Sequence, residues 1–506
     1  MTAPLRPTTP VAIVGAGPVG LALALGLARH GVDSVVLERN PTTSAHSKAA
    51  GIHVRTRDAL RRWGIEDRFL AAGHLVTDLV LHDAGRQDHA LFHLDFRRLE
   101  DEVHRPGLLV LEQSETERLL LEAVRETARC EVVFGAEVTD LEPHEDGVRV
   151  RFRREGEGPP DGLMDAEYVV GCDGASSTVR DVIGAGFEGR TYRLRPMLAD
   201  VAVHDARDDL PWPRLVDRRA GPGGLTAGLR LRRGLWRIIH LTTRTDGPDD
   251  VPDEEVQRRV DAVLGEGPVD VVWSSRFRIH RRSSPRFRHG RILLAGDAAH
   301  VHSPVGGQGM NAGIQDASSL AWQLAGAVGG DDADRLLDAY DAERRAVVGG
   351  VSRFTDALTR VYLQAPRWLR RTVFTVQRSA LRIPAVHRRA LRRMAMLDLR
   401  LPASPLVDRA DRAAGTRLPD PLLIAPDGCE RRLHQLLPVG PALVRVGGET
   451  DDPPNGGDEA DVEAVIRIGP GGHHDPSGLL RGLTGGDDGW VLVRPDGCVA
   501  WARSDC

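Results

Sequence analysis

A glycine-rich turn near the N-terminus constrains the fold of this chain more than any other feature. The segment GAGPVG at residues 15–20 follows the apolar run VAIV and precedes a helix-like stretch. In such a turn Gly15 permits the tight bend, Gly17 lets the backbone approach a pyrophosphate, and Gly20 allows helix and strand to pack closely. Glu38 ends the next strand-like run, about 20 residues on, where a carboxylate can bind ribose hydroxyls. The segment predicts a βαβ unit that binds an adenine dinucleotide, but it does not separate NAD from FAD.

The apolar stretch at residues 11–28 is long enough to resemble an export signal. It divides, however, into a short strand, a glycine turn and a helix, and a charged strand end follows at residues 37–39. A buried parallel strand also reads as a continuous apolar run. We therefore interpret the stretch as part of the folded core rather than as a leader.

Composition and charge exclude several classes of protein. Hydrophobic residues make up 41% and charged residues 27%, as in ordinary globular proteins, and the net charge of −5 does not favour nucleic-acid binding. The five cysteines are dispersed and form no CxxC, so we expect neither a disulfide framework nor a metal site. A cytoplasmic protein without nucleic-acid or membrane partners is predicted.

The pattern of strands and helices predicts several units. We expect a first part of the dinucleotide domain at residues 1–75, further strands at 76–105, a second part of the dinucleotide domain at 106–188, an inserted β-sheet domain at 189–282, a third part with a helical region at 283–400, and a small α/β domain at 401–506. Helices are expected at residues 57–70, at 114–128 with a capping box of Ser114 and Glu117, from about Gly313, and through 331–400. Strands are expected at 225–231 and 235–241, with an Asp/Pro-rich loop at 245–254.

Two later motifs distinguish between the dinucleotides. CDGASSTVR at residues 172–180 and RILLAGDAAH at 291–300, together with the glycine turn, resemble the conserved motifs of class A FAD-dependent aromatic hydroxylases, the p-hydroxybenzoate hydroxylase family. Three motifs in family order indicate FAD. The resemblance covers residues 11–340 and extends more weakly to the terminal segments 415–420 and 490–501, which look like the thioredoxin-like extension of hydroxylases of aromatic polyketides. It implies an α/β fold with a Rossmann-like FAD-binding domain, an inserted β-sheet substrate domain, a helical segment and a thioredoxin-like C-terminal domain.

The resemblance also implies roles for individual residues. Asp297, after a buried strand, should bind the ribityl chain, the glycine-rich loop before the following helix should lie against the flavin pyrimidine edge, and Asp173 with Arg180 should support the pyrophosphate and the docking of NAD(P)H. Lys48 stands where the family usually has Arg, so the positive charge is kept and bidentate contact is lost. The predicted FAD-binding residues are Gly15, Gly17, Pro18, Val19, Gly20, Glu38, Arg39, Lys48, Gln113, Val138, Asp173, Arg180, Gly296, Asp297, Pro304, Gly307, Gln308, Gly309, Met310 and Asn311.

By resemblance the chain is a single-component monooxygenase that hydroxylates a polycyclic phenol, such as an aromatic polyketide of antibiotic biosynthesis, through a C4a-hydroperoxyflavin. NADPH or NADH would be the co-substrate with O₂, and the chain would act as a monomer or homodimer. Residue type alone does not identify the general base: His53, His93, His240, His300 and His302 are candidates. Two alternatives stay open, a Baeyer–Villiger monooxygenase acting on a polyketide ketone and a flavin-binding protein without catalysis.

Overall fold

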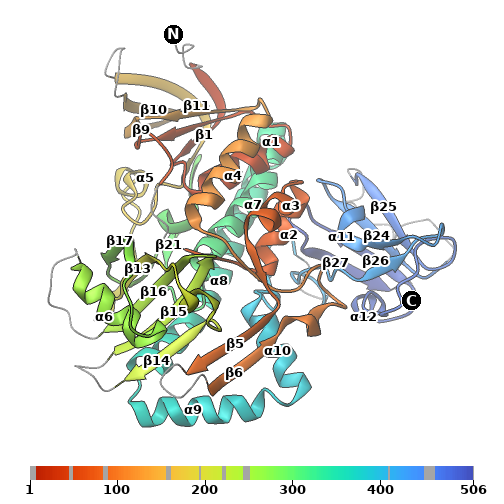
Figure 1. Ribbon diagram of the computed structural model, residues 1–506. Coiled ribbons are helices and arrows are strands. Elements are labelled where there is room, and N and C mark those ends of the chain that lie inside the picture. The colour runs from red at the N-terminus through yellow and green to blue at the C-terminus, as the bar shows by residue number, and fades with distance from the viewer. Residues whose placement is uncertain are drawn as a thin grey trace.

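The computed structural model describes residues 7–44, 49–83, 89–154, 161–192, 195–218, 224–242, 251–407, 411–448 and 462–504. Figure 1 shows a first sheet with its helices at the top, a second sheet at the lower left, and the C-terminal sheet at the right. Long helices run between the two larger sheets. None of the described helices is long and apolar enough to cross a membrane.

The first sheet is built on the predicted βαβ opening. β1 (Thr8–Val14) pairs in parallel with β2 (Ser34–Glu38) and with β11 (Asp161–Gly171), and α1 (Pro18–Arg29) connects β1 to β2. Residues 11–14 are at most 5% exposed, because both faces of this parallel sheet are covered. The remaining strands are β8 (Cys130–Phe134), β20 (Ile292–Leu294), β19 (Arg288–His289), β9 (Ala136–His144) and β10 (Gly147–Arg154).

The second sheet has the order β17-β13-β16-β15-β14-β5-β6, so strands from two distant parts of the sequence form it. This agrees with the expectation of a β-sheet substrate domain. Its strands are β5 (Asp78–Asp83), β6 (His89–Asp95), β13 (Met197–Ala202), β14 (Arg214–Arg218), β15 (Gly224–Arg232), β16 (Leu235–Thr242) and β17 (Asp270–Arg276).

Helix α6 (Asp253–Leu264) covers one face of this sheet and was not predicted. Residues 245–250 of the expected loop lie outside the described residues, and its last two residues, Asp253 and Glu254, lie in the first turn of α6. The buried residues Val256, Val260 and Val263 follow helical spacing. That periodicity was a usable signal for the helix.

Four further helices differ in their bounds from the expectations. The segment expected as one helix at 57–70 forms α2 (Val54–Arg62) and α3 (Glu66–Ala72), since Gly64 between them has a left-handed φ of 76°. α7 (Gly309–Gly329) begins four residues before Gly313. α4 (Gln113–Glu126) begins at Gln113 with Glu112 as its N-cap, so the predicted capping box on Ser114 is wrong.

The region expected to be helical at 331–400 is confirmed. It consists of α8 (Ala333–Thr359), a π-helical turn at Arg360–Gln364, α9 (Arg367–Ala380) and α10 (Pro384–Met394). Short elements complete this part of the chain: β3 (Gly51–Ile52), β4 (His74–Val76), η1 (Phe96–Leu99), β7 (Leu108–Val110), α5 (Thr178–Val182), β12 (Glu188–Thr191), η2 (Ala206–Asp209), β18 (His280–Ser283), η3 (Gly296–Ala298) and β21 (His300–Val301).

The C-terminal part forms its own sheet, of order β25-β24-β26-β27, around a separate apolar core. Its elements are β22 (Leu422–Ile424), β23 (Glu430–Arg432), α11 (Leu433–Leu436), β24 (Ala442–Val446), β25 (Ala464–Ile468), α12 (Arg481–Thr484), β26 (Gly489–Val493) and β27 (Val499–Ser504). The mixed sheet agrees with the small α/β unit expected here. The residue boundaries expected for the individual domains stay predictions.

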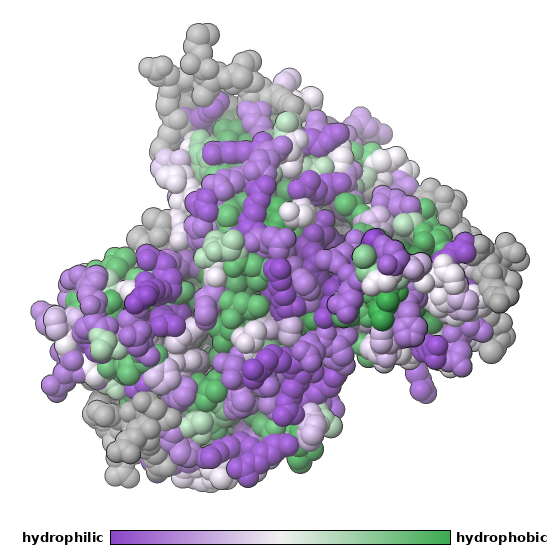
Figure 2. Space-filling model, turned by 45° about the vertical axis from the view of Figure 1, so that its right-hand side comes forward, coloured by the Kyte–Doolittle hydropathy of each residue, from purple (hydrophilic) through white to green (hydrophobic). Residues whose placement is uncertain are grey.

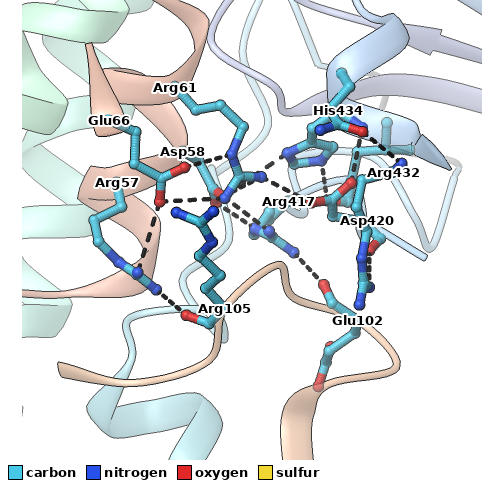
Figure 3. Close-up of polar contacts among 12 residues, drawn as sticks. Arg57, Asp58, Arg61, Glu66, Glu102, Arg105, Arg417, Asp420, Arg432 and His434 are labelled. Atoms are coloured by element: carbon cyan, nitrogen blue, oxygen red, sulfur yellow. Dashed lines mark hydrogen bonds and ion pairs between the residues drawn. The ribbon is translucent and has the colours of Figure 1, made fainter. Parts of the chain in front are cut away.

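Buried charges attach the C-terminal sheet domain to α2 (Figure 3). The Arg417 guanidinium donates to both carboxylate oxygens of Asp58, at 2.6 and 3.0 Å, and Arg61 donates to Asp420 at 2.8 Å. Neither Asp58 nor Arg417 is more than 7% exposed. The docking surface is therefore ionic as well as apolar, and it fixes one helix of the first sheet against the terminal domain.

Candidate functional site

The glycine turn leaves room for a ligand at one position only. A Cβ on Gly15 would lie 2.7 Å from the Cys172 carbonyl oxygen, and a Cβ on Gly20 would collide with the Gly15 carbonyl. A Cβ on Gly17 would have no atom within 4 Å. Gly17 is also the N-cap of α1, without a side-chain cap, so the free N–H groups of that helix border open space. This open position suits a pyrophosphate.

Glu38 covers the glycine turn from the end of β2. One of its carboxylate oxygens accepts a hydrogen bond from the Ala16 N–H at 2.7 Å, and the other accepts from the Asn40 N–H at 2.9 Å. Each oxygen has further lone pairs, so ribose hydroxyls can still bind. Arg39, the next residue, has an exposed side chain.

A second carboxylate, predicted from the sequence only as part of a capping box, lies beside this region. Glu117 of α4 accepts a hydrogen bond from the Gln113 side-chain amide at 2.9 Å and from the Ser44 N–H at 3.0 Å. Burial raises the pKa of Glu117, and the charge of Glu38 raises it further. Gln113 is thus oriented by Glu117, and its own N–H donates to the Ala49 carbonyl.

Asp173 and Arg180 hold the loop that follows β11. The Asp173 carboxylate accepts hydrogen bonds from the Ser177 hydroxyl at 2.6 Å and from the Val179 N–H at 3.1 Å, and burial raises the pKa of Asp173. Arg180 is 5% exposed, so it is not a surface charge. Its guanidinium donates to the carbonyls of Ala175 and Ala298, at 3.0 and 3.1 Å. It thereby joins two loops that lie far apart in the sequence.

The loop after β20 presents Asp297. This side chain is exposed between the buried residues Gly296 and Ala298. Gly296 has a φ of 60°, and a Cβ there would lie 2.8 Å from the Val19 side chain. The loop therefore packs directly on α1, next to the glycine turn, with one carboxylate directed outward.

A buried carboxylate on α7 fixes this loop from behind. Asp316 accepts hydrogen bonds from the Gly296 N–H at 3.0 Å, from His300 Nε2 at 2.6 Å and from Arg344 Nε at 2.8 Å. Burial alone would raise the pKa of Asp316, but His300 and Arg344 outweigh it and the pKa lies below its ordinary value. The sequence analysis missed Asp316. The available signal was that Asp316 is the one charged residue of α7.

The glycine-rich loop before α7 is tied to β3 and α2 by Asn311. The amide oxygen of Asn311 accepts from the His53 N–H at 2.8 Å, and its NH₂ group donates to the carbonyls of Gly51 and Gly307, both at 2.8 Å. The side-chain amide of Asn311 is used to hold the loop. The group that Asn311 can offer to a ligand is therefore its main-chain N–H. The other predicted residues of this segment, Pro304, Gln308, Gly309 and Met310, surround the N-terminus of α7, where main-chain N–H groups and the helix dipole favour negative charge.

Two other residues, Lys48 and Val138, were predicted to bind the cofactor. Lys48 lies outside the described residues. The Val138 side chain is 4% exposed and belongs to the apolar core of the first sheet, so any contact with a cofactor would come from its main chain.

Most of the candidate histidines have structural partners. His53 Nε2 donates to the Gly306 carbonyl at 3.0 Å, and burial lowers the pKa of His53 to about 4. His240 is hydrogen-bonded to Thr226, and burial likewise lowers its pKa to about 4. His300 binds Asp316 as described, and His93, which is exposed, contacts Asp78.

His302 is the candidate that faces the glycine-rich loop. A Cβ on Gly309 would lie 3.8 Å from its ring. The ring stacks on that of His300 with a centroid distance of 6.3 Å, and its Nε2 has no hydrogen-bond partner among the described residues. Burial lowers the pKa of His302 to about 4, so the ring is neutral near pH 7.

The second sheet, which we call the substrate sheet after its predicted role, has two different faces. Residues such as Ala199 and Trp236 pack on α6, and the alternate residues of the same strands face the other way. On that second face Leu231 and Leu235 pack against Val110 and Ala50, which adjoins β3. The same face carries a buried ion pair in which Arg237 donates to both oxygens of Asp200, at 2.8 and 2.9 Å.

Comparisons with known proteins identify the family of this chain. Residues 8–355 match the FAD binding domain family. The chain is 34% identical to an aromatic compound monooxygenase of Bacillus subtilis, covering 97% of this chain and 93% of the relative. It is 33% identical to a 12-dehydrotetracycline 5-monooxygenase/anhydrotetracycline 6-monooxygenase of Streptomyces rimosus, covering 98% and 95%. Among solved structures, an aromatic hydroxylase from angucycline biosynthesis is 30% identical, with a TM-score of 0.78 and coverage of 98% and 97%.

Proposed function

The chain belongs to the class A FAD-dependent aromatic hydroxylases, and from this premise we propose that its substrate is a polycyclic phenol of the aromatic polyketide type. The observation that carries the proposal is the extent of the similarity. Relatives named for tetracycline and angucycline oxidation match along nearly the whole chain, so the likeness includes the substrate sheet and the C-terminal domain as well as the FAD-binding part. NAD(P)H and O₂ are the co-substrates that this chemistry requires.

The residues around the glycine turn fit FAD. Open space at Gly17 would admit the pyrophosphate, Glu38 would bind the adenosine ribose, and Asp297 would bind the ribityl chain. Bound FAD supplies the activation of dioxygen, which no side chain of the protein can perform. The N-terminus of α7 would place main-chain N–H groups against the flavin pyrimidine edge.

The remaining task of the protein is to position the substrate and to exclude water. We propose that the substrate lies on the face of the second sheet that turns away from α6, where Leu231 and Leu235 are buried. His302 is the histidine that we propose to accept a hydrogen bond from the phenol, because it lies beside the glycine-rich loop and its Nε2 has no hydrogen-bond partner among the described residues.

The FAD site is tested with Asp297→Ala. Losing an exposed carboxylate should leave the fold intact but weaken FAD retention roughly tenfold, which corresponds to one lost charge-assisted hydrogen bond. Flavin content per chain after gel filtration measures the effect, with Asp338→Asn, an exposed carboxylate on α8, as the matched control. Unchanged flavin content would remove Asp297 from the site.

The substrate proposal is tested by following NADPH and NADH oxidation with a panel of phenolic polyketides and polyketide ketones under isotopically labelled dioxygen. We expect substrate-stimulated oxidation and a labelled hydroxyl on an aromatic ring. A labelled lactone or ester would instead indicate a Baeyer–Villiger monooxygenase. Substrate binding without stimulated oxidation would indicate a flavin-binding protein without this catalysis. Activity restricted to monocyclic phenols would contradict only the proposal that the substrate is polycyclic.

A further inference from the structure

Helices α9 and α10 form an outer edge of the molecule that the proposed function does not use. Figure 1 shows α9 along the lower border, with α10 beside it, on the side away from the glycine turn. The inner face of α9 is already packed: Phe374 stacks on Phe92 of β6 and on Tyr362, with centroid distances of 6.5 and 5.5 Å. The residues on the outer face therefore need a separate explanation.

That outer face exposes large apolar side chains. Trp368 is 68% exposed, Val376 61%, Ile383 56% and Val386 40%. Trp368, Thr372 and Val376 follow each other at intervals of four residues, so they share one side of α9. An exposed apolar stripe that remains after the inner face has been packed marks a surface that contacts something else.

The charged residues of the same region are almost all positive. Residues 357–397 contain no Asp or Glu, whereas residues 367–394 contain nine arginines, in a chain whose net charge is −5. Some of these arginines have acidic partners elsewhere, as Arg388 has in Asp101. Arg371, Arg382 and Arg389 are exposed, and none of them forms an ion pair with a residue that the structure describes. Figure 2 shows mainly hydrophilic side chains along this lower edge, with hydrophobic ones among them.

We propose that the outer face of α9 and α10 docks on an anionic phospholipid bilayer. An apolar stripe with a tryptophan, flanked by arginines, is the composition of a helix that lies in the membrane interface: the apolar side chains enter the headgroup region and the arginines bind the phosphates. The charge argues against a second copy of this chain, because twofold pairing would bring the same positive face against itself. Overall composition and continuous apolar runs predict no membrane partner, but neither measure detects a stripe formed by helical periodicity.

Flotation of the flavin-loaded protein with vesicles tests the proposal. The protein should float with phosphatidylcholine vesicles that contain phosphatidylglycerol, it should not float with phosphatidylcholine alone, and salt should weaken the binding. Each of Arg371→Gln, Arg382→Gln and Arg389→Gln should weaken it roughly fivefold. Trp368→Ser should also weaken it several-fold.

Matched controls come from another face. Val272→Ser removes a valine that is 63% exposed on β17, and Arg258→Gln removes an exposed arginine of α6; both should bind vesicles as the parent protein does. All substituted positions are exposed, so unchanged flavin content and melting temperature confirm folding. No preference for anionic vesicles would overturn the proposal. Binding as tight as that of the parent protein by a variant that combines Arg371→Gln, Arg382→Gln and Arg389→Gln would also overturn it. Binding to soluble heparin that is as tight as to vesicles and insensitive to Trp368→Ser would indicate an acidic macromolecule instead of a bilayer.

Discussion

Single residues of the glycine turn have separable roles in packing and in binding. Gly15 and Gly20 have no room for a Cβ, because backbone atoms occupy that space, whereas Gly17 faces open space. The spacing of the glycines predicts which of them pack closely and which one faces open space. Each role follows from the geometry of a strand, a tight turn and a helix.

Gly17→Val should therefore weaken FAD binding without unfolding the protein. The valine side chain would occupy the space proposed for the pyrophosphate, and overpacking of about 1–3 kcal/mol corresponds to an affinity roughly 5–150-fold weaker. Isothermal titration of the flavin-free protein with FAD measures this. Gly20→Ala is the contrasting variant: its Cβ would collide with the Gly15 carbonyl, so its melting temperature should fall even without FAD. A Gly17→Val protein that binds FAD normally would contradict the site.

The buried histidine His434 should make stability depend on pH. Burial lowers the pKa of His434 from 6.5 to about 3, although Asp420 opposes the shift. The unfolded chain then binds a proton below about pH 6.5 that the folded chain does not bind, so stability falls as the pH falls. Asp58 and Asp420, whose folded pKa values are lowered, lose their contribution only as the pH falls below 3.8, outside this interval.

Between pH 6.5 and about pH 5, the free energy of unfolding should fall by about 1.5 kcal/mol less in His434→Gln than in the parent protein. Urea denaturation at the two pH values measures the difference. His53 and His302, with folded pKa values of about 4, keep part of the pH dependence in the variant. His204→Gln, at an exposed histidine, is the control. An identical pH dependence in His434→Gln and the parent protein would show that His434 does not carry this effect.

At the scale of elements, α7 and α8 position the loops of the site from behind. Asp316 on α7 holds the Gly296 N–H and is itself held by Arg344 on α8. Helical periodicity predicts that both segments are helices, but it does not identify which inward-facing carboxylate meets which arginine. The capping-box prediction failed for a related reason, because the contact of Glu117 with the Ser44 N–H depends on tertiary packing.

Asp316→Asn should destabilise the protein and loosen the loop that carries Asp297. Removing one partner of a buried ion pair leaves Arg344 uncompensated and costs about 3–5 kcal/mol. Urea denaturation and hydrogen exchange of residues 292–301 measure the two effects, which should appear together. Asp338→Asn removes an exposed partner of Arg288 and should change stability by less than about 0.5 kcal/mol. Unchanged exchange in Asp316→Asn would show that the loop does not depend on this carboxylate.

At the scale of the whole molecule, the ionic contacts of Figure 3 set how the terminal domain sits on α2. α2 begins directly after His53, which contacts both Gly306 and Asn311, so the docking surface and the glycine-rich loop share one helix. The terminal domain thus rests on an element that also shapes the site.

Arg417→Gln should weaken this docking by about 3–5 kcal/mol, because Asp58 would stay buried without its bidentate partner. The double variant Asp58→Asn with Arg417→Gln should be more stable than Arg417→Gln alone, since no uncompensated charge remains. Urea denaturation compares the variants, and Arg431→Gln, in an exposed pair of the same domain, is the control. Equal stability of the single and double variants would contradict the coupling of Asp58 and Arg417.

Local spacing along the chain predicted the βαβ opening, the helical segment at 331–400, two strands of the second sheet and the order of the three FAD motifs. These depend on local spacing, which a strand, a turn or a helix imposes on neighbouring residues. Only the tertiary structure decided that Arg180 joins two loops, that Asp316 lies beneath Gly296, and that Arg417 meets Asp58 across 359 positions of sequence. Such pairs form where elements pack in three dimensions, and no periodicity of the chain records which buried charges come into contact.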